Sequence, residues 1–244
     1  MYTFVAGTTP ALCHAKHCLR TAGIPITETF RWDVKHLLLD VPSFRSDSPD
    51  LITTLSSLPR EITVWGGNLQ HPALKDYHCI DLLKFETYLT ENAAITADCT
   101  LTLMEPMLSV PLSSQKILII GWGRIGKFLA SRLKETGADI TVAARKDSDR
   151  HRLTTLGFQT MNTAQISAGI ADFDIIINTA PATVLTEADL EGCHDCLKID
   201  LASKKGLPGD DVVWARGLPG KLAPERSGRL IAETVLGIMR EEMK

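Results

Sequence analysis

Three glycines near the middle of the chain have the Gly-x-Gly-x-x-Gly spacing of a turn that can approach a phosphate. An apolar, mostly β-branched run over 116–120 precedes them and an amphipathic stretch follows, so we expect a strand, a tight turn and a helix. The first N–H groups of such a helix, together with its dipole, favour the negative charge of a pyrophosphate. The turn is therefore predicted to bind a dinucleotide through Gly121, Trp122, Gly123, Arg124, Ile125 and Gly126.

The end of the next predicted strand indicates which dinucleotide this is. An NAD site carries an acid about 20 residues beyond the glycines, where it binds the ribose 2′-hydroxyl. Here Ala144 is followed by Arg145 and Lys146, and the first acid is Asp147. Arg145 can bind a 2′-phosphate through two parallel, charge-assisted hydrogen bonds, which favours NADP(H). NAD at a solvated basic turn is the alternative.

Polar residues also follow two later predicted strands. In a doubly wound sheet, ligands bind in the crevice at the carboxyl ends of the strands. We therefore expect further cofactor contacts at these two ends, from Asn178, Thr179, Ala180, Pro181 and Asp200. Ser203 and Lys204 follow Asp200, and we place them beside the nicotinamide.

The elements that must position these residues alternate between strand and helix. Strands are predicted over 116–120, 139–144, 174–178 and 196–200, with helices after the glycine turn and near 148–156. Such alternation implies a parallel, doubly wound sheet, a Rossmann fold of the α/β class. The first half reads as a smaller α/β layer, with strands predicted over 2–7, 36–41, 61–65 and 79–83 and a helix over 10–21. Further helices are predicted over 88–108 and 224–243.

Bulk properties describe an ordinary soluble globular protein. The chain has 244 residues, 44% hydrophobic residues and a net charge of −3, and no basic stripe points to nucleic acid. No window reaches about 18 uninterrupted apolar residues, and the start lacks the features of a signal peptide, so we expect no membrane segment. Six scattered cysteines suit free thiols in a reducing cytoplasm.

Two clusters of cysteine and histidine could suggest a metal. Cys13-His14-x-x-His17-Cys18 lies on the first predicted helix, and Cys193-His194-Asp195-Cys196 contains a Cys-x-x-Cys pair. Neither supplies a complete set of four ligands at zinc-finger spacing. The two i, i+4 pairs of the first cluster lie about 100° apart around the helix, which disfavours a shared ion. We therefore predict no metal.

The motifs together resemble those of the dipicolinate synthase A-subunit family. The resemblance covers roughly residues 85–240 and includes 91–98, 121–126, 144–146, 178–181, 200–204 and 217–224. It implies NADP-dependent oxidation of a dihydrodipicolinate-type ring to pyridine-2,6-dicarboxylate in bacterial sporulation, and a partner in the form of a flavoprotein-like B subunit. It also implies a fold like that of the D-2-hydroxyacid dehydrogenases, whose C-terminal helix crosses back to the first domain. We additionally expect a homo-oligomer.

The expected domain boundaries follow from this resemblance and from the predicted elements. They are a shortened, flavodoxin-like α/β domain over 1–86, a linking helix over 87–112, a Rossmann domain over 113–221 and a returning helix over 222–244. Only Gly206 to Arg216 joins the Asp-Leu-Ala-Ser and Gly-Leu-Pro-Gly motifs, where the family has a strand and a helix. The run at 223–228 also departs from the family pattern, as does Cys99 in the linker motif.

A substrate with two carboxylates needs hydrogen-bond donors, and we draw candidates from three segments. They are Asn92 and Thr96 of the linking helix, Ser203 and Lys204, and Arg226 and Ser227 at the start of the last helix. A capped, solvated helix start is an equal interpretation of Arg226 and Ser227. One alternative function is another NADP-dependent 2-hydroxyacid-type dehydrogenase, which needs a late histidine base, yet the last histidine here is His194. The other is a non-catalytic, nucleotide-binding subunit or sensor that uses the Rossmann domain for regulation.

Overall fold

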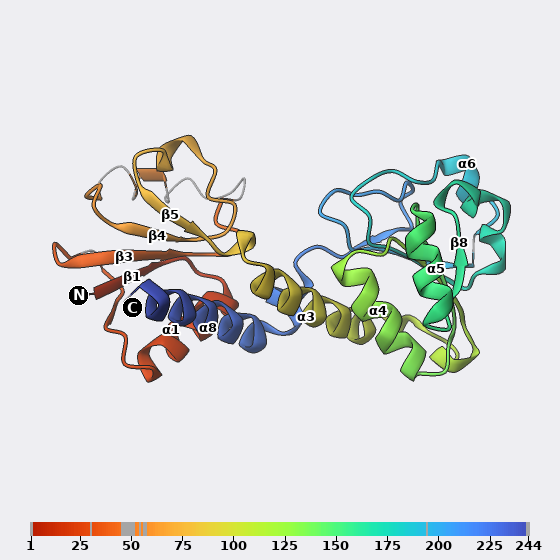
Figure 1. The fold of residues 1–244 in the computed structure, drawn as a ribbon, viewed down its shortest axis with the longest axis horizontal. Helices are drawn as coiled ribbons and strands as arrows, with labels where there is room; N and C mark the ends of the chain where they lie inside the picture. The colour runs from red at the N-terminus through yellow and green to blue at the C-terminus, as the bar shows by residue number, and fades with distance from the viewer. Residues whose placement is uncertain are drawn as a thin grey trace. The chain divides into compact units, whose positions relative to one another are not determined.

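The chain divides into two compact units in this computed structural model (Figure 1). Unit 1 comprises residues 1–95 and 219–244, and unit 2 comprises residues 96–218. The structure describes residues 2–29, 31–44, 52, 53, 55, 58–193 and 195–242. Helix α3 (Glu86–Met104) begins in unit 1 and ends in unit 2.

Unit 1 is built on a parallel sheet with the strand order β2-β1-β3-β4-β5. This is the flavodoxin-like order, in which the chain reverses direction across the sheet between β1 and β3, as the resemblance implies. The strands are β1 (Tyr2–Ala6), β2 (Ile26–Thr27), β3 (Val34–Leu39), β4 (Thr63–Gly66) and β5 (His78–Asp81). The 3-10 turns of this unit are Pro72–Leu74 and Leu82–Lys84.

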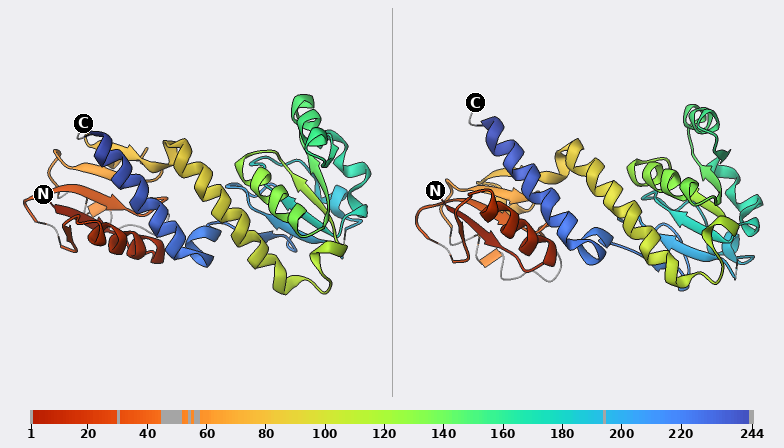
Figure 2. Two further views of the ribbon diagram at one scale, coloured as in Figure 1. Left: turned by 60° about the horizontal axis from the view of Figure 1, so that its bottom comes forward. Right: turned by 90° about the horizontal axis from the view of Figure 1, so that it is seen from below.

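Two helices of unit 1 that are far apart in sequence pack against each other. Helix α8 (Pro224–Glu242) runs beside α1 (Pro10–Thr21), which both views of Figure 2 show. Gly228 permits this close approach, since a Cβ there would lie 2.4 Å from the carbonyl oxygen of Ala11. The C-terminal helix is therefore part of the core of unit 1.

Unit 2 carries a second parallel sheet, with the strand order β11-β10-β9-β6-β7-β8. Numbered from its first strand this is the Rossmann order 3-2-1-4-5-6, so the doubly wound α/β fold is confirmed. Its strands are β6 (Lys116–Ile120), β7 (Asp139–Ala143), β8 (Gln159–Met161), β9 (Ile175–Asn178), β10 (Leu197–Asp200) and β11 (Val213–Trp214). Its helices are α4 (Arg124–Glu135), α5 (Asp147–Thr155) and α6 (Glu187–Leu190), with α7 (Leu218–Leu222) at the boundary. The 3-10 turns are Glu105–Met107, Leu112–Ser114, Thr163–Ala168 and Ile170–Asp172.

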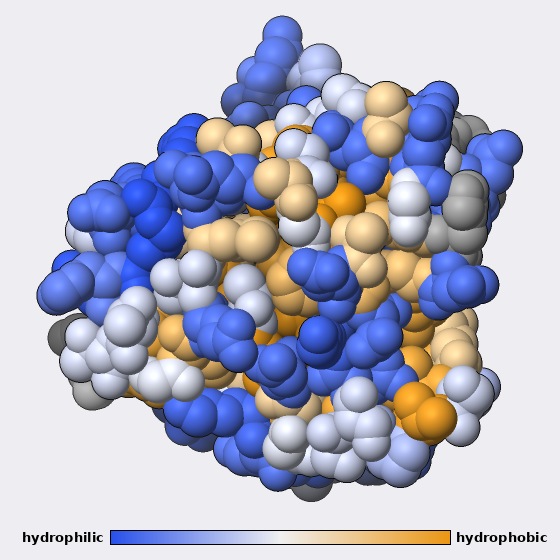
Figure 3. Space-filling model, turned by 90° about the vertical axis from the view of Figure 1, so that its right-hand side faces the viewer, coloured by the Kyte–Doolittle hydropathy of each residue, from blue (hydrophilic) through white to orange (hydrophobic). Residues whose placement is uncertain are grey.

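The core of unit 2 explains why β6 was recognisable as a strand. All of its residues after Lys116 are buried, because both faces of a doubly wound sheet are covered. Leu118 and Ile120 pack in one cluster with Ile176 of β9. Hydrophilic residues cover most of the face that Figure 3 presents, with hydrophobic residues showing between them.

Several boundaries differ from those expected. The expected strands at 36–41 and 61–65 are each shifted by about two residues, and the expected helix at 88–108 is α3, followed by a 3-10 turn that holds Pro106. Strands β2, β8 and β11 were not predicted. In particular, the expectation that 206–216 is only a connection is wrong, because β11 lies within it. His194 and Met243 lie outside the described residues.

The described helices are too short or too polar to lie across a bilayer. Among the residues that the structure describes, no helix combines the length and apolar character needed to cross a membrane.

Candidate functional site

The glycine turn lies at the point where the sheet of unit 2 reverses its winding, between the ends of β6 and β9. Gly121 has a φ of 105°, a left-handed conformation that favours glycine. A Cβ on Gly121 would lie 2.7 Å from Oγ1 of Thr179, and one on Gly126 would lie 2.3 Å from the carbonyl oxygen of Gly121. Both glycines are therefore required for the turn itself.

Gly123 has a different role, because it faces open space. It is the N-cap residue of α4, it is exposed, and a Cβ placed on it would meet nothing within 4 Å. As a glycine it has no side chain with which to cap the first N–H groups of the helix. An anion can therefore approach the positive end of α4 without displacing a side chain at this position. The turn fits the pyrophosphate of a dinucleotide.

The other residues of the turn form its border. The Trp122 ring is half-buried and meets the ring of Phe158 edge-on, with 6.1 Å between centroids. The Nζ atom of Lys127 lies 5.8 Å from the centroid of the Trp122 ring. Arg124 is exposed and Ile125 is half-buried. The aromatic contacts fix Trp122 beside the exposed start of α4.

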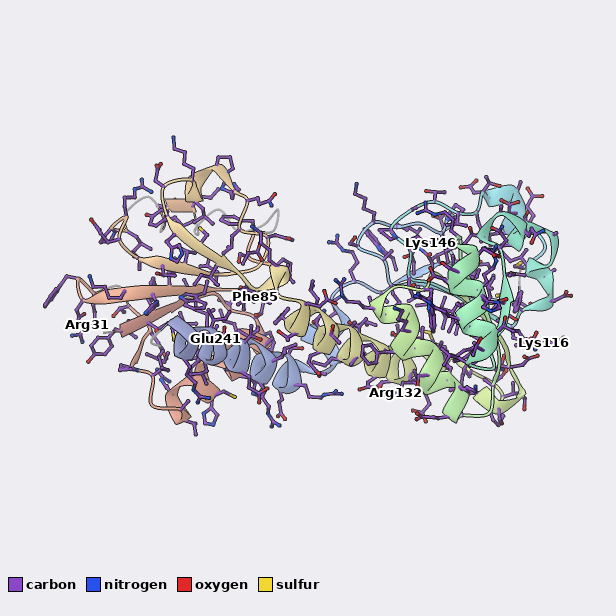
Figure 4. The ribbon with its side chains drawn as sticks, in the orientation of Figure 1. Arg31, Phe85, Lys116, Arg132, Lys146 and Glu241 are labelled. Atoms are coloured by element: carbon purple, nitrogen blue, oxygen red, sulfur yellow. The ribbon has the colours of Figure 1, made fainter. Side chains whose placement is uncertain are left out.

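The end of β7 presents two basic side chains to solvent. Ala144 is buried and its N–H donates to Met161, whereas Arg145 and Lys146 are exposed. Figure 4 shows Lys146 at the start of α5 and Lys116 at the far edge of the sheet, as expected for opposite ends of parallel strands.

Arg150, which no sequence motif marks, organises this basic turn. Its Nη1 donates to the carbonyl oxygens of Ala144 and Arg145, both at 2.9 Å, and its Nη2 pairs with Asp147 at 2.9 Å. The first acid after the strand is thereby paired with Arg150. The turn consequently presents Arg145 and Lys146, while the nearest carboxylate is paired with Arg150.

The ends of β9 and β10 are joined by a buried polar network. Asp200 is fully buried, and its carboxylate accepts hydrogen bonds from the Asn178 side chain at 3.1 Å and from three backbone N–H groups. Those N–H groups belong to Ala202, Gly206 and Leu207. Asn178 also binds the backbone of Ala180 with both its amide nitrogen and its oxygen. These two side chains therefore fix the backbone at the carboxyl ends of β9 and β10.

The loops that this network holds carry most of the remaining predicted residues of unit 2. Thr179 is half-buried, and its hydroxyl donates to the carbonyl oxygen of Ile120, which ties the end of β9 to the glycine turn. Ala180 is half-buried and Pro181 is exposed. Ser203 and Lys204 are exposed in the loop after β10. The structure thus brings together in unit 2 the predicted cofactor contacts with Ser203 and Lys204.

The other substrate candidates lie on helices α3 and α8. Asn92 and Thr96 are one turn apart on α3, the first half-buried and the second buried. Arg226 is exposed in the first turn of α8. Ser227 is 6% exposed, its N–H donates to Ala223, and its hydroxyl has no hydrogen-bond partner in the described part of the chain. The interpretation of Ser227 as a solvated cap is therefore wrong, because the helix already begins at Pro224 and turns this side chain inward.

The cysteines at the start of β10 behave as buried or partly buried thiols. Burial, followed by the neighbouring Cys193, raises the pKa of Cys196 to about 12, and burial also raises the pKa of Cys193. Among the residues that the structure describes, no group of three or more His, Cys, Asp or Glu side chains is placed to hold a metal ion.

The two sheets and the glycine turn define a protein class: a two-unit α/β chain with a Rossmann dinucleotide-binding unit. Residues 85–191 match the family model of the D-isomer specific 2-hydroxyacid dehydrogenase, NAD binding domain. This match supports a nicotinamide dinucleotide as the cofactor.

Individual proteins that are similar to this chain include A subunits of dipicolinate synthase. The chain is 28% identical over 159 residues to the A subunit of dipicolinate synthase from Bacillus subtilis, which covers 62% of this chain and 54% of that protein. The match thus spans about half the length of the curated relative. Solved structures of the same kind of subunit from Bacillus halodurans (TM-score 0.84, 21% identity, 97% and 96% of the two chains) and from Bacillus subtilis (TM-score 0.80, 18% identity, 98% and 95%) share the fold. The resemblance to the dipicolinate synthase A-subunit family is confirmed.

Proposed function

We propose that this protein is an NADP-dependent oxidoreductase that converts a dihydrodipicolinate-type ring to pyridine-2,6-dicarboxylate in the cytoplasm of a sporulating bacterium. The observation that carries the proposal is the pairing of the open glycine turn at Gly123 with the exposed Arg145 at the end of β7. Sequence similarity to the Bacillus subtilis dipicolinate synthase protein supports the choice of reaction.

The geometry supports NADP in preference to NAD. The residue after β7 and its neighbour are Ala144 and Arg145, so no acid occupies the position that would bind a ribose 2′-hydroxyl. Arg150 pairs with the exposed Asp147 and donates to the carbonyl groups of the turn, and Arg145 and Lys146 are exposed cations beside this pair. A guanidinium and an ammonium together match the charge of a 2′-phosphate.

Aromatisation removes two hydrogens from the ring, one as a hydride that the nicotinamide accepts and the other as a proton. The protein has mainly to orient the ring and its carboxylates. In unit 2 the exposed Lys204 supplies a positive charge and Ser203 a hydroxyl donor for that purpose. The Asn178–Asp200 network fixes the loop that carries both. Asn92, Thr96, Arg226 and Ser227 are proposed as further substrate contacts.

The same resemblance suggests partners. We propose a flavoprotein-like B subunit, together with a homo-oligomer of this chain, because the name of the similar Bacillus subtilis protein makes it one subunit of a synthase. A non-catalytic regulatory protein would have the same nucleotide site. Turnover of the substrate therefore distinguishes an oxidoreductase from a regulatory protein.

Turnover of a dihydrodipicolinate-type ring is the direct test. The purified chain, both by itself and with a B subunit, should produce pyridine-2,6-dicarboxylate and NADPH in equal amounts, and a 2-hydroxyacid panel should give no NADPH. Tight NADPH binding without turnover under either condition would point to the regulatory function. Reduction of NADP by a 2-hydroxyacid would point to the other dehydrogenase class.

Cofactor choice is tested by variants of the basic turn. Arg145→Gln should weaken NADPH binding about 10- to 100-fold and leave NADH binding unchanged, because it removes charge-assisted hydrogen bonds to the 2′-phosphate alone. Lys146→Gln should have a smaller effect of the same kind. Lys116→Gln, an exposed lysine at the opposite edge of the sheet, is the matched control and should change neither affinity. Equal losses for both nucleotides in Arg145→Gln would contradict the role of the 2′-phosphate.

A further inference from the structure

Strand β11, which the sequence did not predict, places an exposed tryptophan beside the proposed nicotinamide end of the site. Trp214 pairs in register with Asp200 of β10, and the N–H of Ala215 donates to the Asp200 carbonyl oxygen at 2.9 Å. Trp214 is 43% exposed. It lies at the carboxyl end of its strand, the side of the sheet on which this fold binds its ligands.

Trp214 is held in a fixed position in spite of its exposure. Its indole N–H donates to the carbonyl oxygen of Ala202 at 3.2 Å. Ala202 lies directly before Ser203 and Lys204, and its own N–H donates to the buried Asp200 at 2.9 Å. The indole is thus tied to the loop that the Asn178–Asp200 network fixes.

Arg216 lies over this indole. Its guanidinium carbon is 5.2 Å from the centroid of the Trp214 ring, a cation–π distance. Arg216 is exposed and forms no ion pair with any described residue, and the nearby Asp211 is engaged by Lys198 at 2.6 Å. A guanidinium placed over an aromatic face keeps its planar edge of N–H donors available, and that edge matches a carboxylate bidentately.

The strand order shows where in unit 2 this cation lies. A dinucleotide that crosses the sheet between β6 and β9 has its 2′-phosphate end at β7, where Arg145 is, and its nicotinamide end toward β9 and β10. Strand β11 is the next strand beyond β10, about 5 Å further along the sheet. Arg216 therefore follows the carboxyl end of the strand that borders the nicotinamide end.

We propose that Arg216, held over Trp214, binds a carboxylate of the substrate ring, and that Trp214 positions it. This inference rests on the proposed function and adds to it a specificity-determining residue in the loop after β11. The ligand class is a planar ring that carries a carboxylate. Lys204, in the neighbouring loop, adds a second positive charge on the same side of unit 2.

The test is titration calorimetry of pyridine-2,6-dicarboxylate into the NADPH-loaded chain. Arg216→Gln should weaken binding of the diacid at least 10-fold while the NADPH dissociation constant stays within twofold. Arg216→Lys should recover part of the loss, because it restores the charge without the bidentate geometry. Trp214→Phe keeps an aromatic face but loses the N–H bond to Ala202, and should weaken the diacid about threefold.

Arg60→Gln is the matched control, since Arg60 lies over the Tyr77 ring at 4.7 Å and precedes β4 at the opposite end of its strand. It should leave the diacid affinity unchanged, and thermal melts should show that all variants fold. Diacid binding by Arg216→Gln equal to that of the wild type, or no diacid binding by the NADPH-loaded wild type, would overturn the inference. Failure of the wild type to bind NADPH would instead overturn the proposed function. Comparing diacid binding to the nucleotide-free wild type and Arg216→Gln would then still decide the role of Arg216.

Discussion

The two units have parallel sheets of related topology, yet the first helix of each begins in an opposite way. In unit 1, Thr9 caps α1, its hydroxyl accepting from the N–H of Leu12 at 3.3 Å and donating to Asp40. In unit 2, the N-cap of the equivalent helix α4 is Gly123, which has no side chain and faces open space. One helix start is capped by a side chain of the protein, and the other is open, where we propose that an anion binds.

Glycines at the strand ends are closely approached by side chains in both units. A Cβ on Gly7 of unit 1 would lie 2.6 Å from Oδ2 of Asp40, and one on Gly66 would lie 2.2 Å from Oγ of Ser43. The N–H of the next residue, Gly67, donates a hydrogen bond to the same Ser43 Oγ at 3.0 Å. Gly121 of unit 2 is approached in the same way by Thr179, whereas Gly123 faces open space, where we propose that a ligand binds. Whether a glycine can admit a ligand therefore depends on the atoms that face it, and not on glycine spacing alone.

Gly123→Asp should give the start of α4 a side-chain cap like that of α1, and we expect the largest effect on NADPH affinity from this variant. Its φ of −80° suits any residue, and an aspartate at the N-cap should stabilise α4 by about 0.5–2 kcal/mol. The same carboxylate would occupy and repel the pyrophosphate position, so NADPH affinity should fall at least about 100-fold, or roughly 2.7 kcal/mol. Fluorescence titration and urea unfolding measure the two opposite changes.

Thr9→Ala in unit 1 is the counterpart of that variant. It removes the cap of α1 and should lower the free energy of unfolding by about 1 kcal/mol without changing NADPH affinity. Unimpaired NADPH binding by Gly123→Asp would show that the open helix start in unit 2 is not the nucleotide site.

Asp200→Asn should lower the free energy of unfolding, and it allows the buried carboxylates at the strand ends of the two units to be compared. The variant places an amide NH2 group among donors that now bind a carboxylate, so the free energy of unfolding should fall by about 2–4 kcal/mol in urea titrations. Asp81 accepts backbone N–H groups at the corresponding end of β5 in unit 1, so Asp81→Asn should destabilise similarly. Only Asp200→Asn should also weaken NADPH binding. If Asp81→Asn lowered the NADPH affinity as much as Asp200→Asn, the two networks would not differ in their effect on the nucleotide site.

Thiol reactivity gives the smallest expected effect. Because the pKa of Cys196 is raised to about 12 and that of Cys193 is also raised, both thiols are protonated at neutral pH and should alkylate slowly with iodoacetamide. Cys13 of unit 1 is exposed and should react first by mass spectrometry. The Cys196 rate should keep rising with pH up to about pH 12. Faster labelling of Cys196 than of Cys13 would contradict the burial in unit 2.

The sequence revealed those parts of the site whose signal is local. Strand β6 and the turn after it were predictable because an apolar run meets fixed glycine spacing, and Arg145 follows directly from the end of β7. Trp214 was missed because a strand of 2 residues has no periodicity to detect. Arg150 was missed because its partners are backbone carbonyls, which a pattern of side chains does not reveal. Long-range packing decided the burial of Ser227.

We propose above all that the open glycine turn and the basic turn of unit 2 bind NADP. The most direct measurement is a fluorescence titration of the wild-type chain with NADPH and with NADH under identical salt. The predicted result is saturable binding of both nucleotides, with a dissociation constant for NADPH at least about tenfold lower, because Arg145 and Lys146 would face the 2′-phosphate. Absence of binding by either nucleotide, or tighter binding of NADH, would contradict the claim.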